Sequence, residues 1–93
     1  MTQLLTESEI QTQLEQLSDW QLQDNTIYIT KTFKNFIAAI EFINKLVEPA
    51  EQAAHHPDIA ISYNKVTISL TTHDAGGLTN KDFNLAKVIS AIS

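Results

Sequence analysis

Three histidines and two carboxylates stand out in this sequence because their types and spacing could support proton transfer. His55 and His56 are adjacent, and Glu51 precedes His55 by four residues, the spacing of neighbours on one face of a helix. His73 and Asp82 follow later in the chain. Histidine has an unperturbed pKa of about 6.5, so it gains or loses a proton near neutral pH. Two imidazoles from separate elements could therefore place a proton donor and a proton acceptor around one small substrate.

Blander interpretations of the same residues stay open. Histidines near the C-terminal end of a helix interact favourably with its dipole, so the pair could be an ordinary surface feature. His73, Glu51 or Asp82 could instead complete a metal site, although adjacent helical residues point about 100° apart and do not readily bind one ion. Asp82 could be only a first-turn helix residue, and Glu51 only a solvated one. Trp20 and Tyr63 could be ordinary core aromatics.

The composition describes one ordinary globular domain over residues 1–93, with 43% apolar and 18% charged residues. The chain has no cysteine, which excludes disulfides and thiolate zinc sites. Its net charge of −5 argues against direct binding to nucleic acid, although contact with DNA through a partner protein stays open. We find neither a signal peptide nor an apolar run long enough to span a membrane, so we expect a cytoplasmic protein.

Capping motifs predict where the first and last helices begin. Thr6 and Glu9 form a capping box before a helix over residues 7–17. Thr79 is the N-cap of the last helix, and Asp82 stands three residues later.

A long amphipathic helix carries Glu51 and leads into the histidine pair. Asn35 is its N-cap, and apolar residues then recur every three or four positions. Pro49 favours a kink or an early end, because proline lacks the N–H of a helical hydrogen bond. Pro57 ends whatever remains of the helix.

Alternating apolar and polar residues predict two β-hairpins, one before and one after the long helix. Their turns are Asp24-Asn25 and Asn64-Lys65. The strands cover residues 20–23, 27–33, 59–63 and 66–70. His73 shares strand parity with the polar residues of the last strand and should point away from the buried face. The order α-β-β-α-β-β-α predicts an α+β fold, a four-stranded antiparallel sheet with three helices packed on one face.

The spacing of the candidate residues resembles the signature of the pterin-4a-carbinolamine dehydratases. The spacing is Glu51, three residues, His55-His56-Pro57, five residues, Tyr63, nine residues, His73, eight residues, Asp82. The stretches "HHPD" and "YNKVTISLTTHDAGGLT" are also similar to that family. The resemblance covers nearly the whole chain. Several residues of given types at fixed separations are a far more specific signature than any one of them alone.

The resemblance implies a hydro-lyase that dehydrates 4a-hydroxytetrahydropterin to quinonoid dihydropterin and so recycles the pterin cofactor after aromatic amino-acid hydroxylation. It implies no metal or organic cofactor, and a homodimer or homotetramer. His55 and His73 resemble the acid–base pair, in either order, and His56 the histidine that contacts and orients the pterin. Glu51 would support His55. Asp82 would serve partly as a structural helix cap and partly as a residue of the site.

Two further residues and one departure complete this expectation. Trp20 or Tyr63 could supply the aromatic wall that a neutral heterocycle needs. Pro49 is unusual for the family and could tilt the segment that bears Glu51. The runner-up function is a non-catalytic interaction protein on the same fold, either a dimerisation partner of a transcription factor or a Rubisco-assembly type of factor. The sequence does not identify the physiological pterin, the partner hydroxylase or any regulatory partner.

Overall fold

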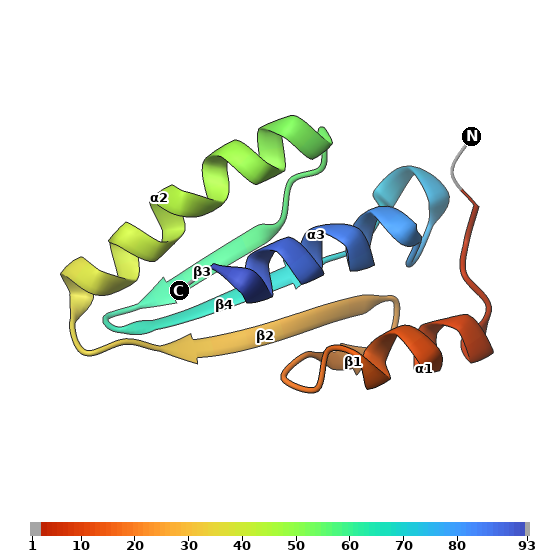
Figure 1. The fold of residues 1–93 in the computed structure, drawn as a ribbon, viewed down its shortest axis with the longest axis horizontal. Coiled ribbons are helices and arrows are strands. Elements are labelled where there is room, and N and C mark those ends of the chain that lie inside the picture. Colours follow the sequence, from red (N-terminus) through yellow and green to blue (C-terminus); the bar gives the residue numbers. More distant parts are fainter. Residues whose placement is uncertain (1–2, 93) are drawn as a thin grey trace.

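The computed structural model describes residues 3–92, and it has a four-stranded antiparallel sheet with helices packed against one face (Figure 1). In chain order the elements are α1 (Glu7–Glu15), β1 (Gln21–Gln23), β2 (Thr26–Thr32), α2 (Phe36–Ala53), β3 (Asp58–Ser62), β4 (Lys65–Leu70), the 3₁₀ helix η1 (His73–Ala75) and α3 (Asn80–Ala91). This confirms the α+β fold and the order of the main elements. The short η1 was not predicted.

The sheet has the strand order β1-β2-β4-β3, which puts β2 and β4 in the centre and β1 and β3 at the edges. Ile68 of β4 lies between Ile29 of β2 and Ile59 of β3. Because side chains alternate along a strand, this row faces the helices, whereas Thr30 and Thr67 meet on the opposite face, where their hydroxyls lie 3.1 Å apart. The sheet therefore has one apolar face and one open polar face.

The capping motifs form as the sequence predicts. In α1 the Thr6 N–H donates to the Glu9 carboxylate at 2.8 Å, and the Glu9 N–H donates to the Thr6 hydroxyl at 3.1 Å. In α2 the Ala38 N–H donates to the Asn35 side chain at 2.8 Å. α1 ends at Glu15, two residues before the predicted boundary.

α2 continues through Pro49 and ends only at Ala53, so the proline does not end the helix. The helix packs against the core on both sides of the proline, because Leu46 and Ala50 are buried. This packing supports the helix where proline removes one hydrogen-bond donor.

The core lies between the helices and the apolar face of the sheet. Ile27, Ile68 and Phe83 have no exposed surface. Trp20 is buried among these residues, and its indole N–H donates to the Ser90 hydroxyl at 2.7 Å. Within the described range, no helix is both long enough and apolar enough to cross a lipid bilayer.

Candidate functional site

The three histidines come together at one end of the fold, around a polar pocket of about 260 Å³. The pocket lies where the loop after α2, the end of β4, η1 and the start of α3 meet. Its lining residues are Ala54, His55, His56, Thr71, Thr72, His73, Asp74 and Lys81. Segments far apart in the sequence therefore build one site.

Ala54 ends α2 and sets the direction of the histidine pair. Its φ of 51° is left-handed, a conformation that favours glycine and costs free energy at alanine. The N–H of His55 then donates back to the Ala50 carbonyl at 3.1 Å, which closes the end of the helix. Both histidines consequently lie outside the helix, and their rings have different partners.

His55 is held by the buried carboxylate of Asp82. The His55 Nε2 lies 2.6 Å from the Asp82 Oδ1, and the two side chains are 10% and 0% exposed. The other carboxylate oxygen accepts from the Thr72 hydroxyl at 2.8 Å and from the Thr79 N–H at 3.0 Å. Asp82 therefore caps α3 and binds the histidine with the same side chain.

The hydrogen-bond network fixes the proton on His55. An ionised carboxylate only accepts, so Nε2 carries the proton that is shared with Asp82. In the neutral ring Nδ1 is then left without a proton and acts as an acceptor. Such a carboxylate–imidazole pair orients the ring and can hold the positive charge that forms when the ring gains a second proton.

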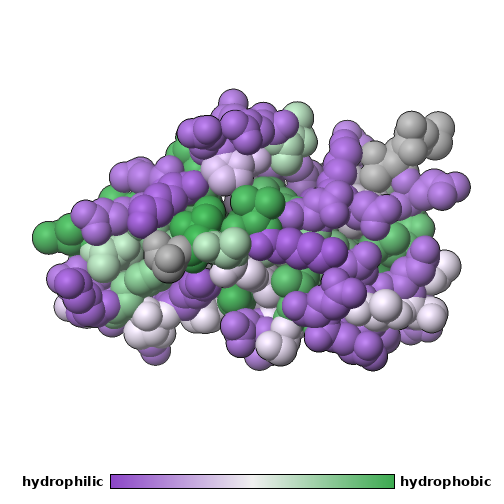
Figure 2. Space-filling view, in the orientation of Figure 1, coloured by the Kyte–Doolittle hydropathy of each residue, from purple (hydrophilic) through white to green (hydrophobic). Residues whose placement is uncertain are grey.

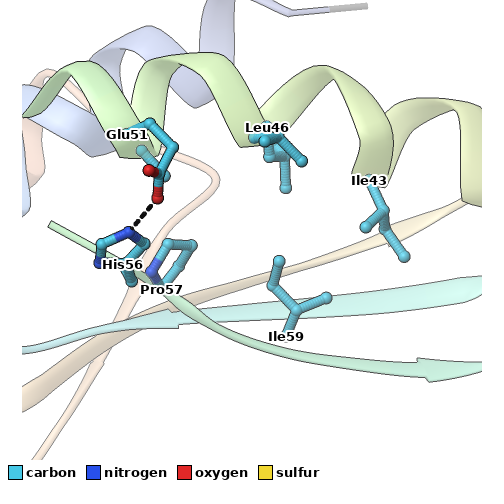
Figure 3. A pocket seen from close by; sticks show the side chains of 8 residues that line it. Ile43, Leu46, Glu51, His56, Pro57 and Ile59 are labelled. Atoms are coloured by element: carbon cyan, nitrogen blue, oxygen red, sulfur yellow. Dashed lines mark hydrogen bonds and ion pairs between the residues drawn. The ribbon is translucent and has the colours of Figure 1, made fainter. Parts of the chain in front are cut away.

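The resemblance had led us to expect that Glu51 supports His55. In the structure Glu51 pairs with His56 instead. The Glu51 Oε2 lies 2.5 Å from the His56 Nε2 (Figure 3). The expectation rested on a helix that continues through position 55, whereas the left-handed Ala54 turns the chain first. This pair is exposed, at 67% for Glu51 and 63% for His56, so it constrains the ring less than Asp82 constrains His55.

His73 is the first residue of η1 and lies beyond β4, not on the strand whose parity was used to orient it. The η1 loop is closed by a hydrogen bond of 3.0 Å from the Thr72 N–H to the Gly77 carbonyl. Gly76 has a φ of 80°, which glycine adopts without steric cost. The exposed His73 side chain has no hydrogen-bond or ion-pair partner within residues 3–92, so its ring is free to contact a ligand.

An apolar groove of about 260 Å³ adjoins the polar pocket and shares His56 with it. It runs between α2 and β3, and Figure 3 shows Ile43 and Leu46 on the helix opposite Pro57 and Ile59 on the strand side. A ligand at His56 could therefore touch a polar surface on one side and an apolar surface on the other.

The two aromatic candidates lie elsewhere in the single chain. Trp20 is a core residue bonded to Ser90, and Tyr63 is 66% exposed in the turn after β3. Neither lines the polar pocket or the groove. In the described part of the chain, no group of three or more histidine, aspartate or glutamate side chains is placed to hold a metal ion.

Sequence reasoning did not identify Thr72 and Lys81. Thr72 shares parity with the buried Ile68 and Leu70, so a hydroxyl directed into the protein could have been noticed as a partner for a buried acid. Lys81 carries no such signal, because its place at the pocket depends on how α3 packs.

Comparison with known proteins identifies the family and the fold of this chain. The family model described as "Pterin 4 alpha carbinolamine dehydratase" matches residues 3–92. A Nostoc punctiforme protein is 66% identical over 99% of both chains, and a Cyanothece protein is 67% identical over 100% of this chain and 96% of its own. Both are provisionally named pterin-4-alpha-carbinolamine dehydratases.

A solved structure has the same fold. It is described as a transcriptional coactivator/pterin dehydratase from Brucella melitensis, with a TM-score of 0.89 and 36% identity over 94% of this chain and 95% of its own. The match of the family model over residues 3–92, together with these relatives, shows that the chain belongs to the pterin-4-alpha-carbinolamine dehydratase family.

Proposed function

We propose that this protein dehydrates 4a-hydroxytetrahydropterin to quinonoid dihydropterin by histidine acid–base catalysis, as a step in pterin cofactor recycling. The observation that carries the proposal is the polar pocket, where the adjacent His55 and His56 converge with His73 from a distant part of the chain. Removal of water needs a proton donor and a proton acceptor with pKa values near neutrality, and imidazoles meet this need.

The reaction balances with two imidazoles. One donates a proton to the 4a-hydroxyl as the C4a–O bond breaks, and the hydroxyl leaves as water. The other takes the proton from the adjacent ring nitrogen, whose N–H electron pair forms the new C=N bond. Exchange with solvent then resets both rings.

The contacts in the pocket support a division of roles. We assign the acid–base pair to His55, which Asp82 orients, and His73, which keeps both ring nitrogens for substrate and solvent. His56, bonded to Glu51 at the border between pocket and groove, would contact and orient the pterin. Either member of the acid–base pair could be the donor.

The direct test is the decay of chemically generated 4a-hydroxytetrahydropterin, followed by stopped-flow ultraviolet absorbance. We expect the wild-type protein to accelerate the decay and His73→Ala to lose about 100-fold or more of that acceleration, the lower range for a general acid or base. Gln11→Ala, on the exposed side of α1, is the control for handling and folding. Folded wild-type protein that leaves the spontaneous rate unchanged would refute the dehydratase proposal.

We also infer that the working form is a homodimer or homotetramer built through the side of α2 and the edge strand β3. Figure 2 shows apolar side chains reaching the surface at the left end of the molecule, where α2 begins. The exposed large hydrophobic residues of α2, β3 and the turn after it are Phe36, Ile37, Val47, Ile59, Ile61 and Tyr63. At roughly 200 Å² for each fully exposed large side chain they present about 600 Å², near the ~800 Å² per partner of a standard interface. Sedimentation analysis of the wild-type protein and of Val47→Glu tests this inference, and a wild-type monomer at micromolar concentration would contradict it.

The apolar surface also supports the alternative of a non-catalytic interaction protein, the class to which the coactivator description of the Brucella structure points. The two functions separate in one pair of variants. His73→Ala should abolish dehydration without affecting partner binding, whereas Ile37→Glu, on the exposed side of α2 and outside both the pocket and the groove, should weaken partner binding without changing the histidines. The substrate's neutrality, the lack of direct nucleic-acid binding and the cytoplasmic location remain predictions from the sequence.

A further inference from the structure

We propose that the substrate site is completed by Tyr63 from a second copy of the chain, which pairs with the first through β3. The catalytic meaning of this inference rests on the proposed dehydratase function, whereas the pairing itself does not. The inference begins with two features that a single chain leaves unexplained, the conformation of Tyr63 and the open edge of β3.

The backbone conformation of Tyr63 is unfavourable for a tyrosine, and no hydrogen bond or ion pair in the described part of the chain accounts for it. Its φ is 54°, a left-handed conformation that is an outlier for a bulky residue, and it precedes Asn64 in the turn from β3 to β4. Its side chain is 66% exposed, and no hydrogen bond to its hydroxyl is found within residues 3–92. Strained backbone of this kind is common where a residue makes a functional contact.

The edge of β3 is arranged to accept another strand. Ser62 pairs with Lys65 across the two-residue turn, so in β3 the hydrogen bonds to β4 come from Ser62, Ala60 and Asp58. The backbone groups of Ile59 and Ile61 therefore point outward, away from β4. The side chains of these two residues are 40% and 37% exposed, an unusual apolar content for a free edge.

Two-fold pairing of this edge fixes which residues meet. The register that pairs all of Asp58–Ser62 with itself puts Ala60 on the two-fold axis and Ile59 opposite Ile61 of the second copy. Two positions further on, Tyr63 of the second copy lies opposite Pro57. Pairing ends there, because proline has no N–H to donate.

Pro57 lines the apolar groove beside His56, so Tyr63 of the second copy arrives where the site lacks an aromatic wall. Among the described residues, neither the groove nor the polar pocket is lined by phenylalanine, tyrosine or tryptophan. A planar heterocycle bound at His56 would gain an aromatic surface from the second copy, together with shielding from water. The site of one chain is thus incomplete without the other.

Single-cysteine variants test the register without any reference to catalysis. The natural chain has no cysteine, so Ala60→Cys introduces one thiol. Across the axis the two Cα atoms would be about 4.5 Å apart, the spacing of a non-hydrogen-bonded pair, which a disulfide can bridge. The matched control is Ser62→Cys, equally exposed on the same strand, whose two copies would be about 13 Å apart at ~3.4 Å per residue. A covalent dimer with Ala60→Cys alone is the expected result, and a dimer linked only through Ser62→Cys, or no dimer, would overturn the inference.

Mixed dimers test whether Tyr63 acts across the interface. Tyr63→Ala should raise KM about tenfold, the scale of one aromatic contact, and His73→Ala should be inactive through its own pocket. After the two variants exchange subunits, a site made of the intact His73 of one chain and the intact Tyr63 of the other should recover wild-type KM in about one quarter of all sites. No recovery on mixing would show that Tyr63 acts in its own chain or not at all.

Failure of the proposed function leaves this inference testable. If the wild-type protein does not accelerate dehydration, the readout becomes binding of 7,8-dihydropterin, by its fluorescence, to dimers locked by Ala60→Cys. Tyr63→Ala in the locked dimer should then weaken binding about tenfold. An unchanged Kd, or a locked dimer that binds no dihydropterin, would refute the role of Tyr63.

Discussion

Replacing Asp82 with asparagine should reverse the tautomer of His55 while leaving the shape of the site intact. One carboxylate oxygen accepts from both the Thr72 hydroxyl and the Thr79 N–H, so the amide oxygen of asparagine must take that position. The amide NH₂ then faces His55 at the place where the carboxylate accepts its Nε2–H, 2.6 Å away in the wild type. Since two donors cannot bond to each other, His55 should move its proton to Nδ1.

The expected loss of activity follows from that proton. Nδ1 is the nitrogen that wild-type His55 has available for substrate, and the variant turns it from an acceptor into a donor. General acid–base catalysis typically contributes 10²–10⁴-fold, so we expect kcat/KM to fall by about 100-fold or more. The free energy of unfolding should fall by only about 1–2 kcal/mol, because both donors keep an acceptor and only the ionic character of the bonds is lost.

Three measurements check this prediction together. Stopped-flow absorbance gives kcat/KM, ¹⁵N–¹H correlation of the imidazole ring gives the tautomer, and urea unfolding gives stability. Asp82→Ala is the matched comparison, because it leaves the buried Thr79 N–H without an acceptor and removes the partner of His55, whereas the Thr72 hydroxyl can still donate to the Thr79 hydroxyl at 2.8 Å. This variant should cost about 2–4 kcal/mol. An Asp82→Asn variant with the Nδ1–H tautomer and wild-type kcat/KM would refute the role assigned to His55. An unchanged Nε2–H tautomer would refute the hydrogen-bond reasoning itself.

Three further predictions concern parts of the chain around the site and the core. Glu51→Gln should change the free energy of unfolding, measured by urea titration, by less than about 0.5 kcal/mol, because the pair that Glu51 forms with His56 is exposed. The same variant should raise KM if His56 orients the substrate. Ala54→Gly should raise the free energy of unfolding by about 0.5 kcal/mol. Glycine relieves the left-handed strain at this position, but the greater entropy of the unfolded chain offsets part of the gain. A lower stability of the variant would contradict this account. Ile68→Ala should lower it by about 3 kcal/mol or more through the cavity left at a fully buried site, and a loss below 1 kcal/mol by thermal or urea unfolding would show that the central strands repack.

The elements of this fold could be predicted because their signals are local. A hydroxyl or amide at a helix start is a signal within one turn of helix, and Thr6, Asn35 and Thr79 all cap as expected. At Thr6 and Thr79 an acid three residues later completes a capping box. Strand alternation likewise gave the buried face of β4 from its own six residues.

The pairing of the site residues could not be predicted, because it depends on one backbone angle. A left-handed helix end is usually signalled by glycine or asparagine, and here the residue is Ala54. Without that signal the sequence predicts a helix that continues past position 54, and such a helix places Glu51 beside His55. Tertiary packing instead brings Asp82 to His55 across 27 residues of sequence.

Pro49 and Trp20 illustrate the same limit in the helix and the core. Proline disfavours a helix locally, but the buried residues on either side of it keep α2 intact to Ala53. Trp20 has the residue type of a pterin wall, but its burial and its hydrogen bond to Ser90 follow from the packing of α3, which the sequence around it does not report. The single-domain extent over residues 1–93 stays a prediction.

The carboxylate of Asp82 has a consequence for how this fold can change over evolutionary time. Because it caps α3 as well as binding His55, a lineage that no longer needs dehydration would still be under selection to keep it. His55 is the partner of that buried carboxylate and is constrained with it, whereas His73 has no hydrogen-bond or ion-pair partner within residues 3–92 and would be free to vary. Descendants on this fold that have become pure binding proteins should therefore be recognisable by an intact aspartate at position 82 together with a replaced histidine at position 73.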